Sequence, residues 1–191
     1  IKFCPFGAFK EVESWENMKK AVETVKRLRA KLVDKVDLLV ECHGRLSPAM
    51  AVLFCEEIAP YHPFFVEEPC LPENIDALVS VVQKTKVPIA TGERIFTKFG
   101  FSQLLEKAKV AVIQPDLGIC GGIMEGKKIA AMAEAHYVGV APHSPYGPIL
   151  AAASLQLAAC IPNFIIQEYC SSFGEGILKK PFEATDGYIE V

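Results

Sequence analysis

Short apolar runs alternate with longer amphipathic stretches along most of this chain. The runs are rich in Val, Ile and Phe and cover residues 36–40, 64–66, 87–90, 110–113, 138–141 and 164–166. Continuous apolar runs of this length are typical of strands that are buried on both faces, as in a parallel sheet. Residues 1–3 are expected to add one more strand, so we expect about seven strands in all.

Helical patterns fill the intervals between these runs. The first helix is expected to begin after Ser14, a residue type that favours helix N-caps, and the second after Ser47, with Pro48 in its first turn. Further helices are expected at residues 75–83, 101–108, 122–135 and 149–159. This alternation of strands and helices predicts an α/β protein with right-handed crossovers.

Polar residues at the ends of the predicted strands favour a closed barrel over an open sheet. Glu41, Glu67 and Glu93 each end or closely follow a strand, and successive ones are 26 residues apart. Further polar residues stand at later strand ends: Asp116, His143 and Glu168. One βα unit takes about 25–30 residues in such a barrel, so each unit returns to the same rim. We therefore predict a TIM-like (β/α) barrel that is incomplete at its N-terminus, because the eighth strand would precede residue 1.

The three evenly spaced glutamates are the strongest chemical signal. Carboxylates on neighbouring strand ends repel one another unless a positive charge lies between them, and a hard, oxygen-seeking cation such as Mg²⁺ meets this need. A single glutamate in such a position more often caps a helix or faces solvent, but three at one spacing favour a metal site. We predict that Glu41, Glu67 and Glu93 bind one ion, with Glu68 and Arg94 as supporting residues.

Two of the four histidines are expected to act at the same site. His143 follows a predicted strand, and Asp116 lies one strand away, where it can orient the imidazole. His43 lies two residues past Glu41 and is therefore expected on the same side of its strand. The other two are expected at the surface: His62 and His136.

Composition and charge limit the classes of partner and the cellular compartment that we expect. The net charge is -3 and no Lys/Arg block stands out, which argues against a nucleic-acid or anionic-membrane partner. The apolar stretches are interrupted well before the roughly 18 residues that a bilayer crossing needs. The seven cysteines are odd in number and form no CxxC pair, which speaks against a zinc knot or a disulfide framework. We therefore expect a cytoplasmic protein in a reducing environment.

These motifs together resemble a known superfamily. In order and spacing they resemble the enolase superfamily, and within it the mandelate racemase subgroup; the matching residues are Lys2, the three glutamates, Gln114-Pro115-Asp116, Gly121-Gly122, Ala141-Pro142-His143 and Gln167-Glu168. Three further segments resemble the acid-sugar dehydratases of galactonate dehydratase type: Glu41-Cys-His43-Gly-Arg45, Glu67-Glu-Pro-Cys-Leu-Pro-Glu-Asn74 and Pro-His-Ser-Pro-Tyr-Gly-Pro148.

The resemblance implies a lyase that dehydrates a sugar acid, an aldonate or aldarate, to its 2-keto-3-deoxy product with one Mg²⁺ per site. A base removes the proton α to the carboxylate, and Mg²⁺ holds the resulting enediolate. By the resemblance, His143 backed by Asp116 is the base, and His43 is the acid that protonates the leaving β-hydroxyl. The remaining roles it implies are a hydrogen bond to the enediolate from protonated Glu168, neutralisation of the substrate carboxylate by Lys2, and substrate contacts from Arg45, Glu168 and His143.

Two positions depart from the family pattern. Glu41 stands where much of the subgroup has Asp, and Cys4 stands where the racemases have a second lysine. A thiol is a poor base at neutral pH unless it is strongly activated, so two-base racemisation is disfavoured and Cys4 is expected in packing or pocket lining.

Other readings remain open at this point. They are a cycloisomerase or an epimerase/racemase of the same superfamily, and a non-catalytic barrel homologue. The resemblance further implies that residues 1–191 are a partial C-terminal barrel domain without its N-terminal capping domain, in a homo-oligomer that acts on a small sugar acid.

Overall fold

The computed structural model of this protein describes residues 1–170 and 177–191. The chain divides into two compact units, the first formed by Ile1–Thr91 with Glu106–Val112 and the second by Gly92–Leu105 with Ile113–Val191. Six strands are hydrogen-bonded in chain order, and helices separate them along the sequence. The α/β class predicted from the hydrophobic pattern is therefore confirmed.

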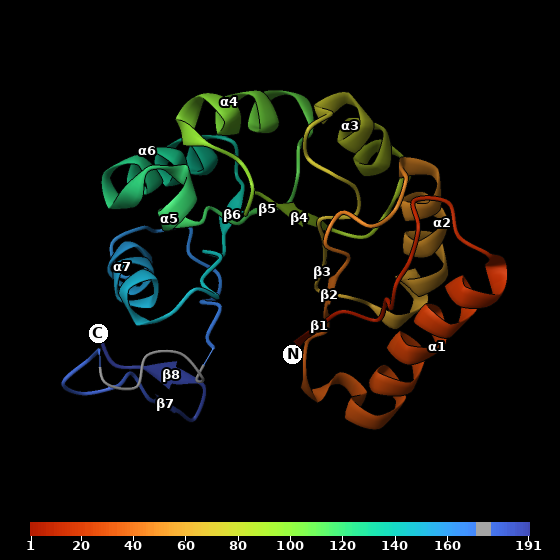
Figure 1. Cartoon of the computed structure of the whole chain (residues 1–191), viewed down its shortest axis with the longest axis horizontal. Helices are drawn as coiled ribbons and strands as arrows, with labels where there is room; N and C mark the ends of the chain where they lie inside the picture. The colour runs from red at the N-terminus through yellow and green to blue at the C-terminus, as the bar shows by residue number, and fades with distance from the viewer. Residues whose placement is uncertain (171–176) are drawn as a thin grey trace. The chain divides into compact units, whose positions relative to one another are not determined.

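The first unit follows the predicted order of strands and helices (Figure 1). Its elements are β1 (Lys2–Phe3), α1 (Trp15–Leu32), η1 (Val33–Lys35), β2 (Leu39–Glu41), α2 (Pro48–Ile58), η2 (Ala59–Tyr61), β3 (Phe65–Glu67), α3 (Ile75–Lys84) and β4 (Ile89–Thr91). The two predicted N-caps are confirmed, since the side chains of Ser14 and Ser47 accept hydrogen bonds from the backbone N–H groups of Asn17 and Met50.

The helices of the first unit pack on one side of its strands, with α1 next to α2 and α2 next to α3 (Figure 1). Their inward faces supply fully or almost fully buried side chains: Met18, Val25, Phe54, Ile58, Leu78 and Val81. Burying apolar area of this kind contributes about 25 cal/mol per Å² to the stability of the fold.

Parallel register brings the ends of β2 and β3 together. Leu39 pairs with Phe65 and Glu41 pairs with Glu67, and every residue of both strands is buried. Because parallel strands in this register end at the same level, the carboxylates of Glu41 and Glu67 leave the sheet at one edge. The next pair continues the pattern, with Glu67 beside Ala90 of β4.

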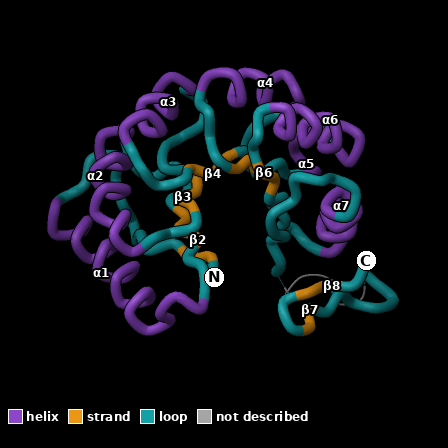
Figure 2. Tube along the Cα trace, turned by 180° about the vertical axis from the view of Figure 1, so that it is seen from behind, coloured by secondary structure: helices purple, strands orange, loops and turns teal. Residues whose placement is uncertain are grey.

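The second unit holds most of α4 (Thr97–Lys107) and the later elements (Figure 2). These are α5 (Leu117–Cys120), α6 (Gly122–Ala135), β6 (Gly139–Val140), α7 (Pro148–Ala158) and an antiparallel hairpin of β7 (Ala184–Thr185) and β8 (Tyr188–Ile189). Strand β5 (Val112–Ile113) spans the boundary between the two units in sequence. Inside the second unit, the backbone N–H of Ala141 donates to the carbonyl of Ile113.

Several elements differ from the sequence-based expectations. Helix α4 begins at Thr97 rather than at residue 101, because Gly100, a poor helix former, obscures its first turn in the sequence. The run at 164–166 makes a single bridge, from Phe164 to Val140, rather than a strand, so the parallel sheet has six strands where about seven were expected. The short helix α5 and the hairpin were not predicted, since elements of two to four residues carry no period.

Among the described residues, six of the seven cysteines are free thiols: Cys4, Cys42, Cys55, Cys70, Cys120 and Cys160. Four are buried, and burial raises the pKa of each of these thiols: Cys42, Cys55, Cys70 and Cys120. Within residues 1–170 and 177–191, none of the helices combines the length and apolar character that a membrane crossing requires.

Candidate active site

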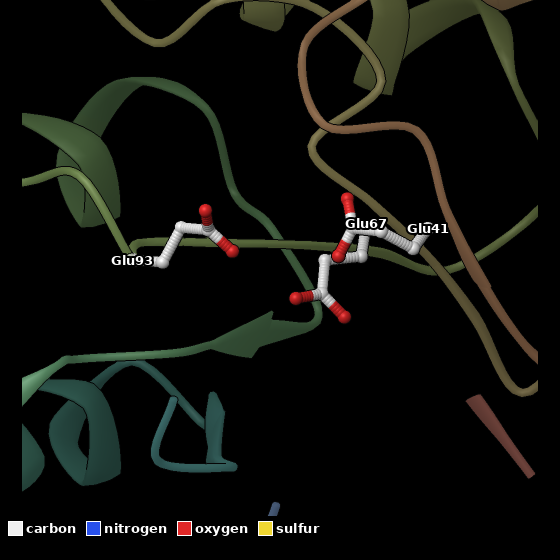
Figure 3. A group of neighbouring side chains, drawn as sticks. All are labelled: Glu41, Glu67 and Glu93. Carbon is white, nitrogen blue, oxygen red and sulfur yellow. The ribbon is translucent and has the colours of Figure 1, made fainter. Parts of the chain in front are cut away.

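The three glutamates predicted from their spacing are buried side chains at strand ends. Glu41 and Glu67 are the last residues of β2 and β3, and Glu93 follows β4 after a single glycine, Gly92. Their exposed fractions are 2%, 0% and 8%. One carboxylate oxygen from each lies within 4.8 Å of the others, and Figure 3 shows the three as neighbours. This group of acidic oxygens could hold a metal ion.

Lys2 partly neutralises the pair at the ends of β2 and β3. Its Nζ lies 2.9 Å from Oε1 of Glu67 and 3.7 Å from Oε2 of Glu41. One lysine does not offset the pair, because burial and the neighbouring Glu67 raise the pKa of Glu41 to about 10. In addition, Oε2 of Glu41 is buried and accepts no hydrogen bond from the described residues. A divalent cation would supply both the missing charge and the missing partner, so these residues fit a hard metal such as Mg²⁺.

The turn that carries Glu93 requires glycine at position 92. Gly92 has φ +139, and a Cβ there would lie 2.9 Å from the backbone N of Gln114. A side chain would therefore be strained by its backbone and would collide with the adjoining segment. Arg94 pairs with Glu93 across 3.5 Å between Nε and Oε1, in the supporting position that was expected.

His143 and Asp116 form a buried pair within the second unit. They face each other across an isolated parallel bridge, and Nδ1 of His143 lies 2.8 Å from Oδ2 of Asp116. The other carboxylate oxygen of Asp116 accepts from the backbone N–H of Gly118, which fixes it as the N-cap of α5. An ionised Asp116 can only accept, so Nδ1 of His143 carries a proton and Nε2 of the neutral ring is left without one.

The other ring nitrogen of His143, Nε2, faces two further carboxylates. Its Nε2 lies 3.4 Å from Oε2 of Glu93 and 3.9 Å from Oε2 of Glu168. Burial lowers the pKa of His143, but the hydrogen bond to Asp116 and the charges of Glu93 and Glu168 outweigh it and hold the pKa above its ordinary value. A base must be neutral, so a cation that compensates the charge of Glu93 would favour the base form.

Glu168 is held by the segment that follows His143. The backbone N–H of Ser144 donates to its Oε2 across 2.7 Å. The carboxyl thereby keeps a defined position near the imidazole, while its residue is only part-buried.

The backbone conformation at His43 differs from the extended one that the sequence predicted. Strand β2 ends at Glu41, and His43 has φ +50, so the two-residue alternation of a strand does not apply to it. Its backbone N–H donates to Oε1 of Glu41 across 2.6 Å, and its exposed ring places Nδ1 2.9 Å from Nη1 of Arg45. Arg45 also lies 3.4 Å from the sulfur of Cys4. Cys4 is exposed, which argues against the packing role and leaves the lining of a pocket as its expected role.

Two histidines lie at the surface, and the sequence assigned no role to two other residues, Tyr146 and Gln114. His62 and His136 are exposed, as expected. Tyr146 was given no role, although its ring lies edge-on to that of His143, with centroids 5.6 Å apart. Gln114 was assigned only to a sequence motif, yet it is almost completely buried and precedes Asp116 by two residues. Its spacing of two residues from Asp116 was the available signal.

Comparison with known proteins identifies the family. Residues 2–191 match the enolase C-terminal domain-like family. The chain belongs to this family. The resemblance to the enolase superfamily inferred from the motifs is therefore confirmed.

Several proteins of known sequence or known structure are similar to this enolase-like chain. It is 44% identical over 148 residues to a D-galactonate dehydratase of Cronobacter sakazakii, an alignment that covers 78% of the chain and 39% of that protein. A proposed mandelate racemase/muconate lactonizing enzyme from Labrenzia alexandrii shares 39% identity with a TM-score of 0.93, covering 98% of this chain and 52% of that one. A proposed dehydratase from Mesorhizobium loti shares 36% identity with a TM-score of 0.94, covering 99% and 53%.

The enolase-like chain thus spans about two fifths of the curated relative and about half of the solved structures that it matches. Its fold is that of these enzymes over the shared part.

Proposed function

We propose that the full-length protein dehydrates a sugar acid, a galactonate-like aldonate or an aldarate, to a 2-keto-3-deoxy acid. The observation that carries this proposal is the buried His143–Asp116 pair, whose free nitrogen lies 3.4 Å from Glu93 of the acidic group. Such a pair is suited to removing a proton beside a carboxylate held at a cation. The 44% identity to a D-galactonate dehydratase supports the choice of substrate class.

The reaction removes one molecule of water from the acid. His143 takes the proton from the carbon next to the carboxylate through Nε2, and Asp116 stabilises the imidazolium that forms. The bond from the next carbon to its hydroxyl then breaks, and the hydroxyl leaves with a proton supplied by His43. The enol that remains takes up a proton on carbon to give the keto acid.

The charge that develops on the substrate carboxylate needs fixed partners. Glu41, Glu67 and Glu93 would hold one Mg²⁺, which supplies a positive centre for that charge when bound. Lys2 would neutralise the same carboxylate, and Glu168, in its protonated form, would donate a hydrogen bond to it. Arg45 would contact the substrate from its place beside His43.

The proposal also covers the domain, the cellular compartment and the oligomeric state. Residues 1–191 would form the C-terminal barrel domain of a cytoplasmic homo-oligomer that acts on a small sugar acid. The free thiols of the described residues, such as Cys42, Cys55 and Cys120, support a reducing environment.

A panel of sugar acids tests the proposal. The full-length protein with Mg²⁺ is incubated with aldonates and aldarates in D₂O, and keto-acid formation and α-proton exchange are measured. We expect keto acid from at least one galactonate-like member, and loss of exchange in His143→Asn but not in the matched control His136→Asn, whose histidine is exposed. An isomer in place of a keto acid would favour a cycloisomerase or epimerase instead.

The metal part of the proposal has its own test. Calorimetric titration with Mg²⁺ should give binding to the full-length protein and a much weaker response in Glu67→Gln. Equal heats from both proteins would refute the metal site and favour a non-catalytic homologue.

A further inference from the structure

Gln114 is a buried polar residue whose side-chain oxygen has no partner among residues 1–170 and 177–191. The residue is 4% exposed, and among the described residues no donor reaches its Oε1. Buried polar groups are nearly always hydrogen-bonded, because an unpaired group has given up its bonds to water and gained nothing in return. An orphaned acceptor that a protein retains beside its reactive residues points to a partner that arrives from outside.

The backbone places Gln114 against the reactive group of the second unit. It follows β5 and precedes Asp116 by two residues, in an extended segment where φ and ψ of Asp116 are -87 and 119. Side chains two residues apart on an extended segment lie on the same side, so Gln114 shares the side of Asp116. Its backbone also packs against Gly92, the residue that precedes Glu93. Gln114 therefore adjoins two residues that contact His143.

The chemistry of the orphaned atom restricts what can satisfy it. Oε1 of an amide is an acceptor, so its partner must be a donor. An ionised substrate carboxylate offers no donor, whereas each hydroxyl of a sugar acid offers one. Among the groups of an ionised sugar acid, the partner is therefore a hydroxyl.

We propose that Gln114 is a substrate-binding residue whose side-chain oxygen accepts a hydrogen bond from a hydroxyl of the sugar acid. This inference rests on the proposed function and deepens it, because it makes the site select hydroxy acids over analogues that lack the hydroxyl. When such an analogue binds, Oε1 stays buried and unpaired, and the loss of affinity is about 10–100-fold.

The matched variants are Gln114→Met and Ser154→Ala. Methionine keeps the length of the glutamine side chain and removes its amide. Ser154 lies inside α7 and is also completely buried, with no donor or acceptor among the described residues within bonding distance of its Oγ. Ser154→Ala thus removes an unpaired polar atom from the interior without touching Gln114, Asp116 or His143.

Steady-state kinetics of the full-length protein with Mg²⁺ tests the contact between Gln114 and the substrate hydroxyl. The probes are the sugar acid of the panel with the highest turnover and its analogues that each lack one hydroxyl, used as competitive inhibitors. In the wild-type protein one analogue should bind about 10–100-fold more weakly than the parent acid. Gln114→Met should raise KM for the parent by the same factor, leave kcat within about threefold, and bind that analogue as the wild-type protein does. Ser154→Ala should keep the wild-type values.

Thermal unfolding without substrate gives an independent measurement. Removing an unpaired buried amide relieves a desolvation penalty, so Gln114→Met should unfold at the same temperature as the wild-type protein or above it, as should Ser154→Ala. A clearly lower midpoint for Gln114→Met alone would show that the amide has a structural partner and would overturn the inference. A stable Gln114→Met with unchanged KM and unchanged discrimination would overturn it as well, since an internal water would then suffice. Absence of turnover across the panel would overturn the proposed function, and the hydroxyl contact with it.

Discussion

Metal binding at the three glutamates is expected to release a proton at neutral pH. Burial and the neighbouring Glu67 raise the pKa of Glu41 to about 10, so Glu41 keeps its proton at pH 7 while no cation is bound. A carboxylate must be ionised to serve as a metal ligand. Binding of Mg²⁺ and loss of this proton are therefore coupled.

The size of the effect follows from the pKa. Three pH units separate neutrality from a pKa of about 10, which corresponds to about 4 kcal/mol of binding free energy used to displace the proton. The affinity for Mg²⁺ should consequently rise about tenfold per pH unit from pH 7 to pH 9. It should level off as the pH approaches the pKa, because Glu41 is then already ionised.

The same shift has a consequence for stability. In the unfolded chain Glu41 loses its proton above its ordinary pKa of 4.5, whereas in the metal-free folded protein it keeps the proton up to about pH 10. Between these values the folded state binds more protons, so its free energy of unfolding decreases as the pH rises. Saturating Mg²⁺ should remove the contribution of Glu41 to this decrease, since the metal-bound residue carries no proton.

Calorimetry in buffers of different ionisation enthalpy measures the released protons directly. We expect about one proton per Mg²⁺ at pH 7, a pH-independent and weaker affinity in Glu41→Gln, and wild-type behaviour in Glu134→Gln, a control at an exposed position of α6. Unfolding midpoints at pH 6 and pH 9, with and without Mg²⁺, check the stability argument. Binding without proton release, at an affinity that is constant from pH 7 to pH 9, would refute the reasoning.

Two further predictions concern the second unit. Asp116→Asn should slow α-proton exchange in D₂O, followed by NMR, by about 10²–10⁴-fold with little change in KM, because an amide cannot stabilise the imidazolium of His143; exchange at the wild-type rate would exclude Asp116 from this role. Gly92→Ala should lower the unfolding midpoint by roughly 5–10 °C, because strain at φ +139 adds to the collision with Gln114. Gly122→Ala is its control, with φ +84 and nothing within 4 Å of the added carbon, and an equal loss in both variants would mean that the collision contributes nothing.

Much of the first unit could be predicted because its signals are local. Ser14 and Ser47 begin helices through hydrogen bonds to residues three positions away, so the chain around them is sufficient evidence. The apolar runs that became β2, β3 and β4 are buried on both faces, and continuous apolar runs are typical of such strands. The even spacing of three glutamates then carried the prediction of an acidic group, which the structure brings together.

The failures arise where a particular backbone contact overrides the pattern of residue types. His43 leaves the alternation of β2 because its backbone takes a positive φ and donates to the carboxylate of Glu41. The run at 164–166 has the composition of a strand, yet it forms only one bridge, to Val140. Neither outcome can be read from residue types, since each depends on what lies beside the segment in space.

The sequence by itself determined the α/β class, the positions of most helices and the identity of the acidic residues at the strand ends. These follow from periodicity, capping and spacing, which act over a few residues or one repeating unit. Only the tertiary structure decided that Nδ1 of His143 meets Asp116 and that Lys2 lies against Glu67. It also decided that the amide oxygen of Gln114 finds no donor in the part of the chain that the structure describes. Hydrogen bonds and desolvation depend on the three-dimensional surroundings of each atom, and those surroundings are set by packing between segments that are remote in the sequence.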